Sequence, residues 1–255
     1  RKDGYHNIET VFYPLTLSDA LEVLPSNKGE FSFYQSGLQI DANVEDNLIV
    51  KAYRLLKDEF QLPSVEIYLH KVILFGAGLG GGSSNASFML KMLNELFSLD
   101  LSNENLKKYA AKIGADCPFF IENKAVFATG IGDEFKDINL SLKGKYLILV
   151  KPNLHISTAE SYSSVIPKFP SISLYDIIEK EPIENWKNLI KNDFEEVFFK
   201  KHPQTKKIKD ELYELGAVYV SMSGSGASFY GIFNEQVEKE NIDFKEYFTW
   251  TDYLL

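Results

Sequence analysis

Residues 76–86 read G-A-G-L-G-G-G-S-S-N-A, so five of eleven positions are glycine. Apolar residues then recur at helical spacing: Met89, Met92, Leu93, Leu96 and Phe97. This pattern predicts a glycine loop that runs into the N-terminus of a helix. Glycine lets a ligand approach bare backbone, and the first turn of a helix offers unpaired N–H groups and the positive end of a dipole. The loop is therefore a predicted anion site, with phosphate as its commonest ligand.

Other glycine motifs fit this loop less well. Gly76, Gly78 and Gly81 satisfy G-x-G-x-x-G, but the dinucleotide fold also needs an acid at the end of a second strand, and Asp100 follows the helix directly. No lysine stands where a Walker loop requires one, and neither H-R-D nor D-F-G occurs downstream. A plain glycine turn with an ordinary helix cap is the remaining alternative.

Composition narrows the class of protein. The 255 residues are 45% hydrophobic, enough for one large domain or two modest ones. Because 36 acids outnumber 27 bases, a nucleic-acid partner is not expected. A single cysteine, Cys117, excludes an internal disulfide framework and suits a reducing, cytoplasmic setting. No apolar run is long enough for a membrane span, no signal peptide is visible, and no metal-ligand spacing links the four histidines to Cys117.

The pattern of elements is mixed α and β. Alternating residues at Val11–Leu24, Phe31–Phe33 and Leu38–Ile40 predict antiparallel strands, with turns at Pro25–Glu30 and at Ser36-Gly37. A helix capped at Asp46 or Asn47 follows, then a strand from Val65 to Ile73 that leads into the glycine loop. Residues 174–201 are expected to be helical. Polar residues and glycine cluster near 137–144, where we expect a domain junction.

The run G-A-D-C-P-F-F, residues 114–120, carries the strongest candidate for chemistry. Asp116 lies between a predicted helix stop and an apolar segment, and partial desolvation there raises the pKa of a carboxyl group unless a cation is near. Such a carboxylate can act as a base, or orient a hydroxyl, in phosphoryl transfer. An Asx-turn with no chemical role is the alternative.

Two further turns carry weaker signals. Asp3-Gly4 predicts a tight turn directly before Tyr5 and His6, whose side chains can face a pocket. Residues 222–227 read M-S-G-S-G-A, where glycines allow a close backbone approach to a ligand. Taken alone, each is equally well explained as an ordinary hairpin turn.

Together, D-G-Y-H, the glycine loop, G-A-D-x-P and M-S-G-S-G resemble, in the same order, the motifs of the GHMP small-molecule kinases. The form of the loop resembles one branch, the diphosphocytidyl-methylerythritol kinases of isoprenoid precursor synthesis. The resemblance covers about residues 1–233. It implies a two-lobed α+β fold, with an N-terminal lobe like ribosomal protein S5 domain 2 and a ferredoxin-like C-terminal lobe. Residues 1–138 would form the ATP-binding lobe, and residues 139–255 would complete the acceptor site.

The resemblance also implies ATP, with Mg²⁺, as a cosubstrate. Ser83 or Ser84 would help to hold phosphate or the metal ion, and Lys71 would reach the nucleotide, although a solvated charge at the end of a strand fits Lys71 equally well. Two interpretations of Asn47 stay open: a helix cap alone, or a helix cap that also lies near the adenine. The implied ATP-binding residues are Asn47, Leu48, Lys71, Gly76, Ala77, Gly78, Leu79, Gly80, Gly81, Gly82, Ser83, Ser84 and Asn85.

For the acceptor, the resemblance implies cytidine contacts from Tyr5, His6, Thr158 and Tyr162, with Asp116 as the catalytic carboxylate. The implied acceptor-binding set also includes Gly224, Ser225 and Gly226. The chain departs from the family where Leu74 replaces a proline and Tyr162 replaces a phenylalanine. The family's active-site lysine, in an A-K-[IL]-N motif, would lie ahead of Arg1. Asn192-Asp193-Phe194 matches a family helix to which we assign a packing role.

The predicted function is ATP-dependent phosphorylation of the 2-hydroxyl of a CDP-linked methylerythritol in the non-mevalonate pathway. A GHMP kinase for mevalonate, homoserine or a sugar is one alternative, and an inactive nucleotide-binding homologue is another. The expected setting is cytoplasmic, without a nucleic-acid or membrane partner, as a monomer or homodimer.

Overall fold

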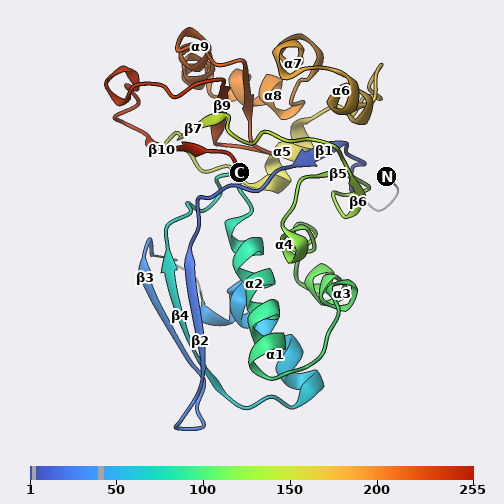
Figure 1. Ribbon diagram of the computed structural model, residues 1–255, viewed down its shortest axis with the longest axis vertical. Helices are drawn as coiled ribbons and strands as arrows, with labels where there is room; N and C mark the ends of the chain where they lie inside the picture. Colours follow the sequence, from blue (N-terminus) through green and yellow to red (C-terminus); the bar gives the residue numbers. More distant parts are fainter. Residues whose placement is uncertain (2–3, 40–42) are drawn as a thin grey trace. The chain divides into compact units, whose positions relative to one another are not determined.

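The computed structural model describes residues 1, 4–39 and 43–255 (Figure 1). Contacts between residues divide the chain into two compact units. The C-terminal unit comprises residues 1–10, 76–79 and 137–255, and the N-terminal unit comprises residues 11–75 and 80–136. The glycine loop therefore passes from one unit to the other at Leu79–Gly80. The functional division into an ATP-binding lobe and an acceptor lobe stays a prediction.

A three-stranded sheet forms one side of the N-terminal unit, with the strand order β2-β4-β3. Its strands are β2 (Ala20–Pro25), β3 (Ser32–Gly37) and β4 (Val65–Lys71). β2 pairs with β4 antiparallel, but β3 pairs with β4 parallel. The prediction of antiparallel strands was thus wrong for β3, because helix α1 (Leu48–Phe60) carries the chain back between β3 and β4 in a crossover connection.

The predicted turn at Ser36-Gly37 was also wrong, since both residues lie within β3. The predicted strand from Leu38 to Ile40 is wrong for Leu38 and Gln39, which lie beyond the end of β3, and Ile40 lies outside the described residues. By contrast, the expected cap is confirmed, because the Asn47 side chain accepts a hydrogen bond from the Ile49 N–H at the start of α1.

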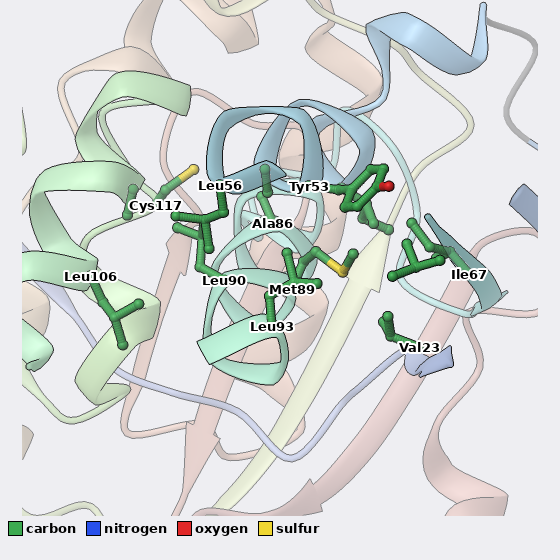
Figure 2. Close-up of a cluster of buried hydrophobic side chains, with 14 of the residues drawn as sticks. Val23, Tyr53, Leu56, Ile67, Ala86, Met89, Leu90, Leu93, Leu106 and Cys117 are labelled. Atoms are coloured by element: carbon green, nitrogen blue, oxygen red, sulfur yellow. The ribbon is translucent and has the colours of Figure 1, made fainter. Parts of the chain in front are cut away.

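The core of the N-terminal unit lies between this sheet and helices α1 and α2 (Gly81–Leu96). Along β4 the buried positions alternate with more exposed ones, so Val65, Ile67, Leu69 and Lys71 all point inward. Figure 2 shows Met89, Leu90 and Leu93 of α2 at the centre of the cluster, with Tyr53 and Leu56 of α1 beside them. Helix α2 thus packs its buried face against the sheet and α1, while Phe88 and Leu96 stay exposed.

Further elements complete this unit. Helices α3 (Asn103–Ile113) and α4 (Phe119–Glu122) pack on α2, as Figure 1 shows. Ser102 caps α3, since its hydroxyl accepts from the Asn105 N–H. A second sheet has the order β1-β5-β6, with β1 (Thr10–Phe12), β5 (Val126–Thr129) and β6 (Glu134–Asp137). A 3-10 turn, η1 (Val44–Asp46), precedes α1.

The C-terminal unit is built on a four-stranded antiparallel sheet with the order β10-β7-β9-β8. Its strands are β7 (Tyr146–Lys151), β8 (Tyr219–Met222), β9 (Phe229–Phe233) and β10 (Phe248–Tyr253). Apolar side chains of β7, β8 and β9 pack with those of helices α8 and α9 in a single core. The helices of this unit are α5 (Thr158–Ser164), α6 (Leu174–Lys180), α7 (Ile183–Leu189), α8 (Phe194–Lys201) and α9 (Lys206–Glu214), with 3-10 turns η2 (Pro203–Thr205) and η3 (Lys239–Asn241).

Residues 174–201 are helical, as expected, but in three pieces rather than one. Pro182 separates α6 from α7, because proline lacks the N–H that a continuous helix needs. Residues 190–193 form the second break, ahead of α8. Within the described residues, no helix is long and apolar enough to cross a membrane.

Candidate active site

The N-terminus of α2 is a bare helix start. Its first residue, Gly81, follows Gly80, which has φ 65° and makes no side-chain cap hydrogen bond. The Ser84 N–H donates to the Gly80 carbonyl at 2.8 Å, so the helical bonds begin there and leave the N–H groups of the preceding turn without helical partners. The predicted loop-to-helix transition is confirmed, and its geometry is that of an anion site.

Small residues at this helix start are required by their neighbours in the N-terminal unit. A methyl group on Gly80 would lie 2.8 Å from the Phe120 ring, and one on Gly81 would lie 2.8 Å from Ile73. At Gly82 it would meet Leu48 at an ordinary 3.7 Å. The start of α1, with Leu48 and its cap Asn47, is thus adjacent to the start of α2.

Lys71 is held beneath the same helix start. Its side chain is buried, and its ammonium donates to Asp19 at 2.5 Å. The position of a methyl group on Gly81 would be only 3.2 Å from Lys71 Nζ, so the ammonium approaches the first residue of α2. Burial lowers the pKa of Lys71, although Asp19 opposes that shift. The proposed nucleotide contact of Lys71 stays a prediction, and in this structure Asp19 is its partner.

Asp19 is a residue that the sequence analysis missed. Its second carboxylate oxygen accepts from the Val72 N–H at 2.7 Å and from the Ile73 N–H at 2.8 Å. Burial alone would raise the pKa of Asp19, but Lys71 and the two amides more than offset it, so the pKa lies below 3.8. Asp19 therefore fixes the chain where β4 ends and the approach to the loop begins. The inward position of Lys71 in β4 was the available signal that a buried acid must face it.

Asp116 lies in the turn between α3 and α4, as the G-A-D motif predicts. The turn is closed by the Cys117 N–H, which donates to the Gly114 carbonyl at 3.1 Å. It is also attached to α2, because the Ser87 hydroxyl donates to the Cys117 carbonyl at 2.6 Å and Ser83 hydrogen-bonds the Cys117 thiol. The residue after Asp116 is thus held by the first two turns of α2.

The surroundings of Asp116 suit a base. Its side chain keeps a solvent-exposed surface, so a substrate hydroxyl can reach it. Burial by protein on its other sides raises the pKa of the carboxyl group above 3.8. A carboxylate of this kind accepts a proton more readily than one in open water.

In the C-terminal unit, residues 76–79 lie against the turn of the M-S-G-S-G-A motif. The Ser223 hydroxyl donates to the Gly78 carbonyl at 2.6 Å, and the Ser228 N–H donates to the Ala77 carbonyl at 3.3 Å. A methyl group on Gly78, where φ is 70°, would lie 2.2 Å from the Ser223 carbonyl oxygen. Only glycine permits this approach of backbone to backbone.

The predicted cytidine residues partly come together in the C-terminal unit. The rings of His6 and Tyr162 are 5.4 Å apart in an edge arrangement, while Tyr5 is 61% exposed. The Ser225 hydroxyl is 3.4 Å from that of Thr158. Gly224 and Gly226 both have positive φ, as a close turn requires. Asp3, the first residue of D-G-Y-H, lies outside the described residues.

Comparison with known proteins defines the class. The family of GHMP kinases N terminal domains matches residues 47–124, and the family of GHMP kinases C terminal domains matches residues 174–242. With relatives as similar as those below, the chain belongs to the GHMP kinases, and it is an ATP-dependent small-molecule kinase. The predicted family and its α+β fold are confirmed.

The similar proteins point to one branch. The 4-diphosphocytidyl-2-C-methyl-D-erythritol kinase of Bacteroides fragilis is 53% identical over 250 residues, which cover 97% of this chain and 91% of that protein. The enzyme of that name from Parabacteroides distasonis is 49% identical over 255 residues, which cover 100% of this chain and 93% of that protein. A crystal structure of 4-(cytidine 5'-diphospho)-2C-methyl-D-erythritol kinase matches with a TM-score of 0.80 at 29% identity, over 98% of this chain and 91% of that one. The crystal structure of a homoserine kinase from Cytophaga hutchinsonii matches with a TM-score of 0.66 over 96% of this chain and 93% of that one. Because the two sequences are only 16% identical, this match supports the fold alone.

The close contact at Gly78 makes a prediction. Gly78→Ala is expected to raise the KM for ATP by about 10-fold or more, because the loop must shift away from Ser223 and small displacements of binding groups are costly. Gly144→Ala is the matched control, since Gly144 also has positive φ but nothing within 4 Å. Steady-state kinetics with ATP varied would contradict the role of this contact if both variants had the same KM.

Proposed function

We propose that this chain transfers the γ-phosphoryl group of ATP to the 2-hydroxyl of 4-diphosphocytidyl-2-C-methyl-D-erythritol, in the non-mevalonate route to isoprenoid precursors. The observation that carries the transfer itself is the bare start of α2 with the Asp116 turn attached to it through Cys117. The acceptor follows from relatives of that name at 53% and 49% identity over nearly the whole chain.

In this proposal the triphosphate binds along Gly76–Asn85. Backbone N–H groups of the loop and of the first turn of α2 donate to phosphate oxygens, and the helix dipole favours their negative charge. Asn47 and Leu48 are proposed to contact the adenine, since Leu48 lies beside Gly82. Fixed donors of this kind need no reorganisation as charge develops in the transition state.

Asp116 is the proposed catalytic residue. Its carboxylate takes the proton of the acceptor hydroxyl, or orients that hydroxyl, as the oxygen attacks the γ-phosphorus. Its exposed surface and raised pKa support both roles. Positioning and electrostatic stabilisation supply most of the acceleration, because phosphoryl transfer needs little covalent assistance from the protein.

Magnesium is proposed to arrive with ATP. Among the described residues no group of three or more His, Cys, Asp or Glu side chains could hold a metal ion, which fits an ion bound chiefly by phosphate oxygens and water. The hydroxyl of Ser83 or of Ser84, in the first turn of α2, is proposed to assist. When bound, the ion neutralises charge on the phosphates.

The acceptor is proposed to lie against Tyr5, His6, Thr158 and Tyr162, with Gly224–Gly226 close to its phosphates. Stacking on an aromatic ring holds a base at little entropic cost. We also propose that the N-terminal lobe, residues 1–138, binds ATP and that residues 139–255 complete the acceptor site. The enzyme is proposed to act in the cytoplasm as a monomer or homodimer, without a membrane or nucleic-acid partner.

An acceptor panel tests this function. With ATP and Mg²⁺, ADP release is expected with the CDP-linked methylerythritol but not with mevalonate, homoserine or a hexose. Tyr162→Ala should raise the KM for the CDP-linked acceptor by about 10-fold, as the loss of one base-stacking ring implies, with little effect on the KM for ATP. Tyr34→Ala, which removes an exposed tyrosine of the other unit, is the control.

The outcomes separate the alternatives. Turnover of another acceptor would make the chain a different GHMP kinase. Binding of ATP without turnover of any acceptor would indicate a nucleotide-binding protein that has lost its activity.

A further inference from the structure

The turn between β8 and β9 is held both by its own hydrogen bonds and by hydrogen bonds from elsewhere in the C-terminal unit. Within the turn, the Ser223 N–H donates to the Ser228 carbonyl at 2.8 Å and the Gly226 N–H donates to the Ser223 carbonyl at 3.0 Å. Gly224 and Gly226 have φ of 54° and 95°. The Asn192 side-chain amide donates to the Met222 carbonyl and to the Gly224 carbonyl, each at 2.8 Å. Asn192 therefore hydrogen-bonds to the backbone on both sides of Ser223.

The Asn192 amide is fully used. While its nitrogen donates both hydrogens to the turn, its oxygen accepts from the Phe194 N–H at 2.9 Å, at the start of α8. The three contacts fix the orientation of the amide, since only the oxygen can face an N–H and only the nitrogen can face two carbonyls. The contact with the Phe194 N–H needs only the amide oxygen. A role at the start of α8 therefore does not explain the two hydrogen bonds that the amide nitrogen donates to the turn.

A residue of α8 itself holds the same peptide segment. Glu195 is buried one turn after Asn192, accepts from the Met222 N–H at 2.8 Å and pairs with Lys209 at 2.6 Å. The start of α8 thus binds Met222 through its N–H and its carbonyl. This rigid attachment sets the position of the next residue, Ser223.

Ser223 connects the turn to the glycine loop. Its hydroxyl donates to the Gly78 carbonyl at 2.6 Å, and its own carbonyl lies so close that residue 78 can only be glycine. The chain of contacts therefore runs from Asn192 through Ser223 to Gly78. All of these residues belong to the C-terminal unit.

We propose that Asn192 is a positioning residue for nucleotide binding, which acts through Ser223 to set the conformation of Gly76–Gly78. It touches no substrate itself. The inference rests on the proposed function, because it assumes that this segment binds the phosphates of ATP. The asparagine assigned a packing role from the sequence thus gains a role at the site.

Asn192→Asp separates the two roles of the amide. Aspartate keeps the oxygen that accepts from the Phe194 N–H, but it presents a second oxygen to the two carbonyls where asparagine presents its N–H groups. The KM for ATP is expected to rise about 10-fold or more, in line with the loss of two hydrogen bonds and the repulsion between the new carboxylate and two carbonyls, with a smaller change in kcat. Ser223→Ala should reproduce the rise, and the double variant should be clearly less impaired than the sum of both, because the residues act in series.

The matched control is Asn185→Asp, since the Asn185 amide donates only to the exposed carboxylate of Glu181. Binding of a non-hydrolysable ATP analogue by calorimetry gives the same comparison without any acceptor. If the wild type bound the ATP analogue but did not phosphorylate the CDP-linked acceptor, the proposed acceptor would be wrong. The comparison of ATP-analogue affinities would still test the role of Asn192. Hydrogen exchange at residues 76–79, expected to be faster in Asn192→Asp and Ser223→Ala than in Asn185→Asp, tests the link even without nucleotide. Unchanged ATP affinity and unchanged exchange in a folded Asn192→Asp protein would overturn the proposal.

Discussion

Replacing Asp116 with asparagine is expected to lower kcat by at least about 10²-fold, the loss typical of a missing general base. Asparagine has nearly the same shape but cannot accept a proton. The Cys117 contacts that position the turn involve a neighbouring backbone and thiol, so they survive the change. The KM for ATP should change little, because α2 keeps its bare start. Single-turnover rates and steady-state kinetics measure both effects.

The pH dependence of this variant follows from the raised pKa of Asp116. In the wild type, kcat should fall as the pH drops through a pKa above 3.8, because a protonated carboxyl cannot act as a base, and this acid limb should be absent from the residual activity of Asp116→Asn. The contribution of Asp116 to folding stability changes with pH in the opposite direction to kcat. A folded-state pKa above the unfolded value adds stability only at low pH and loses it as the pH rises through the folded pKa. The unfolding temperature of Asp116→Asn at neutral pH is therefore expected not to fall.

Asp133→Asn is the control for this prediction, since Asp133 also lies in a turn of the N-terminal unit and uses its oxygen only to accept from the Ile131 N–H. Near-normal kcat in Asp116→Asn would remove Asp116 from the mechanism. A large loss of kcat together with a lower unfolding temperature would instead indicate a structural role for the carboxylate.

Breaking the Asp19–Lys71 pair is expected to have the largest effect on stability. Asp19→Asn should cost about 3–5 kcal/mol of unfolding free energy, because it leaves a buried ammonium without its countercharge. Asp19→Asn/Lys71→Met should recover most of that loss, since it removes both charges. Chemical denaturation of the two variants and the wild type measures the difference.

A surface pair in the same unit serves as the control. Lys107 and Glu122 are 2.6 Å apart but about a quarter exposed, so Glu122→Gln should cost no more than about 1 kcal/mol. If Asp19→Asn cost as little as this control, the buried pair would contribute no more than an ordinary surface contact. If the double variant were as unstable as Asp19→Asn, the loss would come from hydrogen bonds to Val72 and Ile73 rather than from charge.

The pH dependence of this effect has a definite sign. The folded-state pKa of Asp19 lies below the usual 3.8, so its stabilising contribution is present above that value and is lost as the pH falls through the lower folded-state pKa. The difference in stability between the wild type and the double variant should therefore be constant near neutral pH and shrink only below about pH 4. The ATP affinity of the double variant then shows whether the Lys71 ammonium beneath Gly81 contributes to nucleotide binding.

Much of the site could be predicted from local patterns. The glycine run before an amphipathic segment predicted the bare start of α2, and the G-A-D motif predicted a turn that presents Asp116. Both depend on neighbouring residues in the chain, because glycine conformation, helix capping and turn chemistry are short-range effects. The roles of individual residues toward ATP and the acceptor stay predictions.

Local sequence patterns could not predict contacts between residues that are distant in the chain. Lys71 fitted a solvated end of a strand as well as a nucleotide contact until the fold placed Asp19 against it, 52 residues earlier. β3 looked antiparallel because strand periodicity carries no direction, and only the α1 crossover made it parallel to β4.

The amino-acid sequence by itself determined the class of this protein, the bare start of α2 and the candidate carboxylate, because those features reside in a few consecutive residues. Tertiary structure alone decided which side chains support them, namely Asp19 beneath α2 and Asn192 behind Ser223. Buried charges and amide groups are stable only when partners satisfy them, and those partners are brought together by packing rather than by proximity along the chain.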